Sequence, residues 1–111
     1  ETRVGGPFAP LHRWLGERIA AGRAYGFFRP YTGEVCAVAP EPWHLSFAPL
    51  AWECQRSFDP GALRQAHRDA GLALQPVIDD CCEEILGRYF DVPAALYASA
   101  RQPDNLAEMI T

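Results

Sequence analysis

The chain has 111 residues, of which 49% are apolar and 12% aromatic, which is enough material for one domain with a hydrophobic core. Its net charge is −4 and all ten basic residues are arginines, so the sequence does not predict the basic face that nucleic acid requires. No apolar run approaches the roughly 18 residues that cross a bilayer, and residues 1–6 lack the features of a signal peptide, so we expect no membrane span.

The first predicted element is a helix that begins near Pro10, a residue that a first helical turn tolerates. Gly22 supplies its stop, and its apolar positions follow one helical face: Leu11, Trp14, Leu15 and Ile19. The aromatic-rich residues 24–29 then predict a strand, residues 31–34 a turn, and residues 35–38 a second strand. Together they predict a strand, a turn and a strand that lead into an unusual segment at residues 39–47.

This central segment combines stiff backbone with two chemically active side chains. Pro40 and Pro42 bracket Glu41 and bias the backbone toward extended geometry, and His44 follows three residues after the carboxylate. In an ideal strand Glu41 and His44 would lie on opposite faces, so only a bulge or turn at residues 42–43 brings them together. Such a pair would supply one general-base candidate, Glu41, and one metal-ligand candidate, His44. The alternative is a packed strand start with a hydrogen-bonded histidine.

The second half of the chain predicts two further helices. After Phe47 the pair Ala48-Pro49 is expected to end the extended stretch, and we expect residues 50–57 to be irregular, with Trp52 and Cys54 against the core. Asp59 resembles an N-cap before an N1 proline, and from Pro76 to Tyr89 an apolar stripe lies opposite acidic residues. Beyond Pro93 the periodicity is weak, which indicates an extension of the domain. These elements predict an α+β fold, in which a small antiparallel sheet carries the segment Glu41–His44 and helices pack on one side.

The four cysteines lack the C-x-x-C spacing of a zinc knuckle. We expect Cys36, Cys54, Cys81 and Cys82 to be buried small apolar residues, with a disulfide from Cys36 or Cys54 left open.

The sequence Glu41-Pro42-Trp43-His44, followed by Leu45-Ser46-Phe47, resembles the E-P-W-H segment of the VanY-like zinc D-alanyl-D-alanine carboxypeptidases. The upstream run Tyr25-Gly26-Phe27-Phe28-Arg29-Pro30-Tyr31 is also similar, and the resemblance extends from about residue 7 to residue 90. It implies that Glu41 is the catalytic base, that His44 is a zinc ligand, and that Trp43 contacts substrate and orients His44.

The resemblance covers only the C-terminal half of such an enzyme. The family's other two ligands come from an earlier S-x-H-x-x-G-x-A-x-D segment, which this chain does not contain. Residues 1–111 are therefore interpreted as a single domain that forms the C-terminal part of a larger carboxypeptidase-like domain. We expect this portion to be inactive by itself and to self-associate through an unpaired sheet edge or an exposed apolar face.

The expected function is zinc-dependent D-alanyl-D-alanine carboxypeptidase activity on peptidoglycan stem peptides, in the cell envelope or periplasm. One alternative is a non-catalytic module, derived from that fold, that binds peptidoglycan peptides or another protein. A second alternative is a structural domain with a closed zinc site built from Glu41, His44, Cys36 and Cys54.

Overall fold

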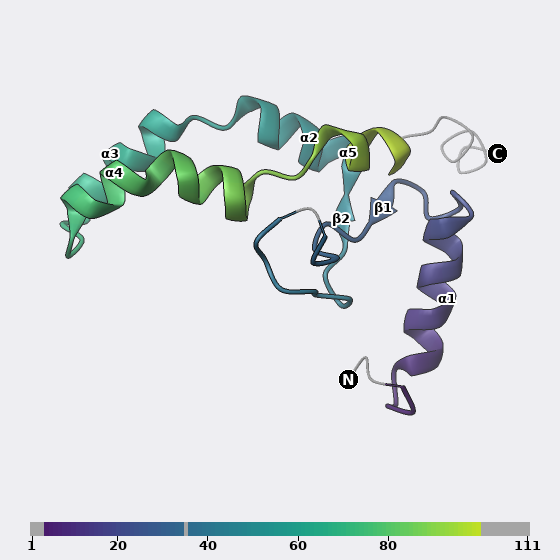
Figure 1. Ribbon diagram of the computed structural model, residues 1–111. Coiled ribbons are helices and arrows are strands. Elements are labelled where there is room, and N and C mark those ends of the chain that lie inside the picture. The colour runs from purple at the N-terminus through teal and green to yellow at the C-terminus, as the bar shows by residue number, and fades with distance from the viewer. Residues whose placement is uncertain (1–3, 35, 101–111) are drawn as a thin grey trace.

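The computed structural model describes residues 4–34 and 36–100 and shows a mixed helical and sheet fold (Figure 1). Its elements in chain order are α1 (Ala9–Ala20), β1 (Phe27–Phe28), β2 (Ser46–Phe47), α2 (Ala48–Ser57), α3 (Pro60–Asp69), α4 (Gln75–Ile85), the π-helix η1 (Leu86–Phe90) and α5 (Ala94–Ala100). None of the helices in these ranges combines the length and apolar character that crossing a membrane requires. The expected α+β class is confirmed at this coarse level.

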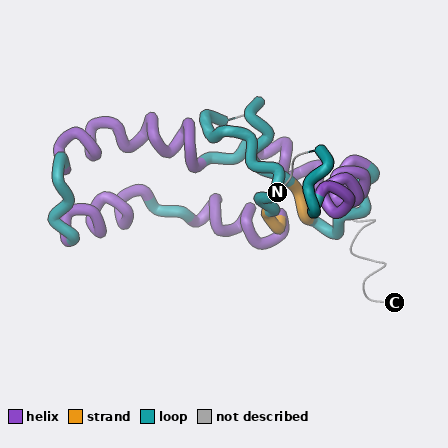
Figure 2. Tube along the Cα trace, turned by 90° about the horizontal axis from the view of Figure 1, so that it is seen from below, coloured by secondary structure: helices purple, strands orange, loops and turns teal. Residues whose placement is uncertain are grey.

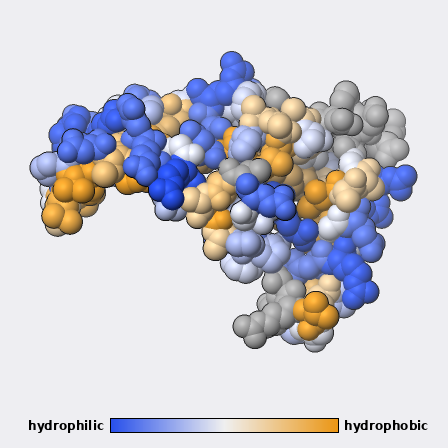
Figure 3. Space-filling view, viewed as in Figure 1, coloured by the Kyte–Doolittle hydropathy of each residue, from blue (hydrophilic) through white to orange (hydrophobic). Residues whose placement is uncertain are grey.

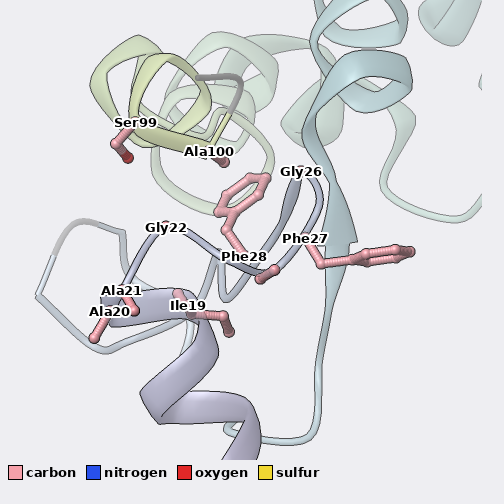
Figure 4. A pocket seen from close by; sticks show the side chains of 10 residues that line it. Ile19, Ala20, Ala21, Gly22, Gly26, Phe27, Phe28, Ser99 and Ala100 are labelled. Atoms are coloured by element: carbon pink, nitrogen blue, oxygen red, sulfur yellow. The ribbon is translucent and has the colours of Figure 1, made fainter. Parts of the chain in front are cut away.

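The sheet is a short antiparallel ribbon of two strands at the centre of the molecule. Phe27 pairs with Phe47, and Phe28 pairs with Ser46. Because side chains alternate along a strand, Phe28 points toward α5 while Phe27 points away from it (Figure 4). The Phe28 ring meets the Tyr97 ring edge-on, with 5.3 Å between the two centroids.

The buried core is small and lies where this ribbon meets α2 and α5. Four residues form its centre and four more pack against it: Phe28, Ala48, Val92 and Tyr97, then Ala51, Trp52, Leu96 and Ala100. Among residues 4–34 and 36–100 few large side chains are buried, so the hydrophobic stabilisation from these residues is modest.

Of the two strands predicted before the central segment, the first is shorter than expected and the second is wrong in its described residues, 36–38. In residues 24–29 only Phe27 and Phe28 are extended, because Tyr25 and Gly26 both have positive φ, 51° and 88°. Residues 36–38 form bends, and the amide N–H of Ala37 donates to the carbonyl oxygen of Arg88 at 2.8 Å instead of to a strand. Residue 35 lies outside the described residues.

The predicted irregular segment at residues 50–57 is also wrong, because it belongs to helix α2. Pro49 stands in the first turn of this helix. A backbone N–H there has no partner within the helix, so proline, which has no N–H, is tolerated. The pair Ala48-Pro49 therefore begins a helix instead of ending a strand. Trp52 packs against the core as expected, whereas Cys54 is exposed.

The other helical predictions agree with the structure in most of their length. α1 ends before Gly22, whose φ is +68°. The Asp59 side chain caps α3 by accepting a hydrogen bond from the amide of Gly61 at 2.8 Å. The predicted third helix is α4, which changes to π-helical geometry at Leu86. The extension predicted after Pro93 contains the helix α5, and residues 101–111 lie outside the described residues.

Helices α2 to α5 form a long arm that leaves the central ribbon and returns to it. α3 packs on α4 at the far end, α2 packs on α5 at the near end, and the rings of Phe58 and Phe90 lie 4.4 Å apart between them (Figure 2). α1 stands apart on the other side of the ribbon (Figure 1). The radius of gyration is accordingly 17.3 Å, compared with about 13 Å for a compact chain of this length.

All four cysteines are free thiols. The prediction that they are buried small residues holds for Cys82 alone, since Cys54 and Cys81 are exposed and Cys36 is partly buried.

Candidate functional site

A tight turn at residues 42–43 brings the side chains of Glu41 and His44 together. The backbone N–H of His44 donates to the carbonyl oxygen of Glu41 at 3.0 Å, which closes the turn. The imidazole Nδ1 then lies 3.2 Å from the carboxylate Oε2 of Glu41. Strand β2 begins two residues later, at Ser46. The pair therefore stands at the entrance of a strand, and the turn brings the two side chains together.

Hydrogen bonds to Tyr31 and Arg29 anchor the loop that carries the Glu41-His44 pair. The amide of Glu41 donates to the carbonyl oxygen of Tyr31 at 2.9 Å. The Arg29 guanidinium donates through Nε to the carbonyl oxygen of Pro42 at 2.8 Å, and through Nη2 to that of His12 in α1 at 3.2 Å. Hydrogen bonds from a charged donor are stronger than neutral ones, so Arg29 is the main link between α1 and the motif loop.

A glycine makes the close approach of this loop to its upstream turn feasible. Gly33 has a φ of +84°, and a Cβ placed on it would lie 2.7 Å from Cγ of Pro40. A larger residue would be strained in that conformation and would also collide with the proline ring. The Gly33-Pro40 contact thus fixes where the loop leaves the turn.

His44 borders a pocket of about 290 Å³ that opens between the motif loop and the arm. Its ring meets the Tyr31 ring edge-on, with 4.8 Å between centroids. Hydroxyl, amide and thiol groups from Tyr31, Ser46, Tyr97, Gln55 and Cys54 line the pocket, and its remaining wall is apolar: Pro30, Ala51, Phe58, Phe90 and Val92. A few convergent polar groups in a mostly apolar hollow are typical of a small-ligand site.

The wall of this pocket is held by the side-chain amide of Gln55. It donates to the carbonyl oxygen of Val92 at 3.0 Å and accepts from the Val92 amide at 3.0 Å, as a neighbouring strand would. The Tyr97 hydroxyl donates to the same Gln55 oxygen at 2.9 Å. Burial raises the pKa of the Tyr97 hydroxyl above its ordinary value, and nearby Tyr31, Asp91 and Cys54 raise this pKa further.

Sequence reasoning did not identify Tyr31, Gln55 or Tyr97 as site residues. Gln55 and Ala51 lie one turn apart on the face of α2 that meets the core, so a helix assigned to residues 48–57 would have indicated that Gln55 is turned inward. Tyr97 carries no such signal, because its position depends on the return of the chain through the whole arm.

Trp43 is 61% exposed and does not line the pocket beside His44. The His44 ring contacts Glu41 and Tyr31. The role of Trp43 in orienting His44 stays a prediction. Contact between Trp43 and a substrate stays a prediction.

Glu41 and His44 are chemically suited to zinc, since imidazole nitrogen and carboxylate oxygen are among its usual ligands. The structure does not bring Cys36 and Cys54 to them: within residues 4–34 and 36–100, no three His, Cys, Asp or Glu side chains form a group able to hold a metal ion. The closed site of four residues is therefore not assembled. The residues present fit a partial site with two donors.

Comparisons with protein-family models, with characterised proteins and with solved structures found no match to this chain.

Proposed function

We propose that this chain contributes the catalytic base and one metal ligand to a zinc-dependent D-alanyl-D-alanine carboxypeptidase. The observation that carries the proposal is the 3.2 Å contact between Glu41 and His44, formed by a proline-stiffened turn at the mouth of a 290 Å³ pocket. The resemblance of residues 41–44 to the E-P-W-H segment supplies the chemistry, and the contact shows that the two side chains lie next to each other. The donors that complete a zinc site would come from outside the described residues.

In this mechanism each of the two residues has a separate task. His44 would hold the metal through Nε2, because Nδ1 faces the Glu41 carboxylate, which fixes the tautomer and the ring orientation. Zinc, when bound, lowers the pKa of a coordinated water and polarises the scissile carbonyl group. Glu41 would turn from Nδ1 of His44 toward the metal side of the ring, accept the proton of the attacking water and deliver it to the amine nitrogen of the departing D-alanine. Both side chains are partly exposed, at 31% for Glu41 and 43% for His44, so substrate has access to them.

The proposed substrate is a peptidoglycan stem peptide that ends in D-Ala-D-Ala. The pocket beside His44 has hydroxyl and amide groups that are suited to peptide carbonyls, and apolar walls that are suited to small side chains. Trp43 would lie against the peptide outside the pocket, since more than half of its surface is open. With such a substrate the protein would act in the cell envelope or periplasm.

We further infer that the two-stranded ribbon is the support of the motif, with helices packed on one side. Two observations favour this arrangement: β2 starts two residues after His44, and α2 and α5 pack against the ribbon face that carries Phe28. The same arrangement would serve the alternative function, a non-catalytic module that binds peptidoglycan peptides or another protein. The exposed Trp43 beside a two-donor site is the observation that favours the alternative.

The test separates Glu41 from His44 by their roles, with D-alanine release and zinc content measured on the same samples of the protein at its natural length. Glu41→Gln keeps the shape of the side chain but removes the base, so zinc should stay bound while turnover falls by roughly 10²- to 10⁴-fold. His44→Ala removes a ligand, so zinc and activity should both be lost. Trp43→Ala should raise KM and leave zinc content unchanged.

His67→Ala on α3 is the matched control, because this histidine lies on the arm and should affect neither zinc nor rate. Two donors leave zinc largely hydrated, so residues 1–111 alone should bind it no tighter than about micromolar. Full zinc and full rate in His44→Ala would refute the ligand assignment. Peptide binding without turnover in the natural protein would support the non-catalytic module instead.

A further inference from the structure

A second groove lies between α1 and the central ribbon, on the opposite face of the ribbon from the motif pocket. Its volume is about 430 Å³, within the range of roughly 300–1,000 Å³ that holds small organic ligands. Seven apolar or aromatic side chains line it: Trp14, Leu15, Ile19, Ala24, Tyr25, Phe27 and Leu45. Phe27 faces this groove, whereas Ser46, the cross-strand partner of Phe28, faces the motif pocket. The alternation of side chains along the strands therefore separates the two sites.

The aromatic walls of the groove are unusually open for residues of their size. Trp14 is 51% exposed, Phe27 45% and Tyr25 41%. Tyr25 also has a φ of 51°, a left-handed conformation that is uncommon for a residue other than glycine, asparagine or aspartate. Strained backbone of this kind clusters at ligand sites, where it aims a side chain at the ligand. Single exposed aromatics are ordinary on protein surfaces, but three around one groove indicate a binding surface.

Two arginines in the lining of the groove supply the chemical specificity. The Arg18 guanidinium lies 5.3 Å from the centre of the Trp14 ring, and the backbone amide of Arg23 donates to the Arg18 carbonyl oxygen at 2.8 Å. Both side chains line the groove. Neither forms an ion pair with a carboxylate within the part of the chain that the structure describes. In a chain of net charge −4, two cations without acidic partners beside an apolar groove are complementary to an anionic ligand.

We propose that this groove binds a linear amphipathic carboxylate of the fatty-acid class. The alkyl chain lies along Trp14, Phe27 and Leu45, and the carboxylate lies at Arg18 and Arg23. A guanidinium group matches a carboxylate with two parallel hydrogen bonds, which fixes the orientation of the ligand in the groove. The site differs in position and in chemistry from the Glu41-His44 site, so it does not depend on the function proposed above.

The test is a calorimetric titration of the protein with decanoate, at concentrations below those at which decanoate aggregates. Decan-1-ol and decyltrimethylammonium have similar chains with a neutral and a cationic head, so both should bind at least about tenfold more weakly than decanoate. Arg18→Gln and Arg23→Gln should each weaken decanoate about tenfold, as expected when a charged hydrogen-bond donor is removed. Ala24→Leu, which places a larger side chain in the lining of the groove, should weaken all three ligands.

Arg56→Gln is the matched control. Arg56 lies 5.8 Å from the centre of the Trp52 ring, much as Arg18 lies over Trp14, but it stands on α2 outside the groove. Its replacement should leave decanoate affinity unchanged. Equal affinity for decanoate and decan-1-ol would overturn the proposal, and so would an equal loss in all three arginine variants. Binding to anionic phosphatidylglycerol vesicles without saturable 1:1 binding of decanoate would also overturn it, and would assign this face to a lipid surface.

Discussion

At the scale of single residues, the Glu41-His44 contact depends on backbone more than on either side chain. Pro40 and Pro42 limit the conformations of the loop, and the hydrogen bond from the His44 amide to the Glu41 carbonyl oxygen closes the turn. The position of that turn also depends on Gly33, which lies against Pro40. A substitution at Gly33 should therefore displace the loop that carries Glu41 and His44, although Gly33 contacts neither side chain directly.

We expect Gly33→Ala to destabilise the protein by about 1–3 kcal/mol, because alanine at a φ of +84° is strained and its Cβ overlaps the Pro40 ring. The measurement is the midpoint of urea unfolding at constant m-value. Gly87→Ala is the control, since a Cβ there has open space and an ordinary φ, so the change should be neutral or stabilise by about 0.4–1 kcal/mol. Equal unfolding midpoints for Gly33→Ala and the parent protein would contradict the argument.

Residue spacing was sufficient to predict that Glu41 and His44 need a turn at residues 42–43 in order to meet. It was insufficient for Tyr31 and Arg29, because their contacts with the loop are made across 10 or more positions and through backbone atoms, which carry no sequence signature. A sequence shows that prolines stiffen the loop, but it does not show which distant residues hold the loop in place.

At the scale of elements, the Gln55 side chain makes the pair of hydrogen bonds to the Val92 backbone that a neighbouring strand would make. Its amide satisfies both backbone groups of Val92 and accepts the Tyr97 hydroxyl, so one side chain joins α2 to the start of α5. The sequence predicted α1, α3 and α4 from caps and periodicity, but not α2 or α5. α2 was missed because Pro49 was interpreted as a stop, and α5 because seven residues with four alanines show little periodicity.

The Tyr97 hydroxyl makes this junction sensitive to alkaline pH. Its pKa is raised in the folded state, chiefly by burial, so the folded chain holds this proton more tightly than the unfolded chain does. The resulting stabilisation is complete below the unfolded pKa of about 10, and is lost as the pH rises through the folded pKa. We expect the free energy of unfolding to decline above about pH 10 for this reason.

Tyr97→Phe should lower stability by about 1 kcal/mol at neutral pH, through loss of the hydrogen bond to Gln55, and should remove this part of the alkaline decline. Urea unfolding at a series of pH values between 7 and 11 measures both effects. Tyr89→Phe is the control: its ring is 47% exposed, so its replacement should leave the decline in place. An unchanged decline in Tyr97→Phe would show that another group is responsible.

At the scale of the whole molecule, the structure is elongated and leaves many apolar side chains exposed to solvent. Its dimensions are 49 × 35 × 22 Å, and many large apolar side chains are more than a third exposed. The apolar stripes of α1 and α4 were predicted from sequence, but periodicity indicates which side of a helix is apolar and not whether anything covers it. Figure 3 shows hydrophobic surface along the lower side and the tip of the arm that contains α3 and α4.

The helix pair α3 and α4 has one polar and one apolar side. Two ion pairs cross it on the polar side, from Arg64 to Glu83 at 3.7 Å and from Arg68 to Asp79 at 4.0 Å. At 100° per residue, the opposite side presents two stripes at i, i+4 and i+8 spacing, all exposed: Ala62, Ala66 and the C-cap residue Ala70 of α3, and Val77, Cys81 and Ile85 on α4. Small side chains on one helix and larger ones on the other make this side complementary to itself under a two-fold axis.

We therefore expect the chain to self-associate through the arm, with the alanine stripe of one copy against the α4 stripe of the other. Val77 is 55% exposed and Ile85 45%, so replacing both by glutamine removes apolar surface without leaving a cavity. Sedimentation equilibrium under reducing conditions, which exclude a disulfide through Cys81, should show a concentration-dependent dimer for the parent and a monomer for Val77→Gln/Ile85→Gln. Glu83→Gln lies on the polar side of the same arm and should still dimerise, because its ion pair with Arg64 is exposed and contributes little. A parent that stays monomeric at every concentration and melts in one cooperative transition would mean that the open side of the arm needs no second copy to cover it.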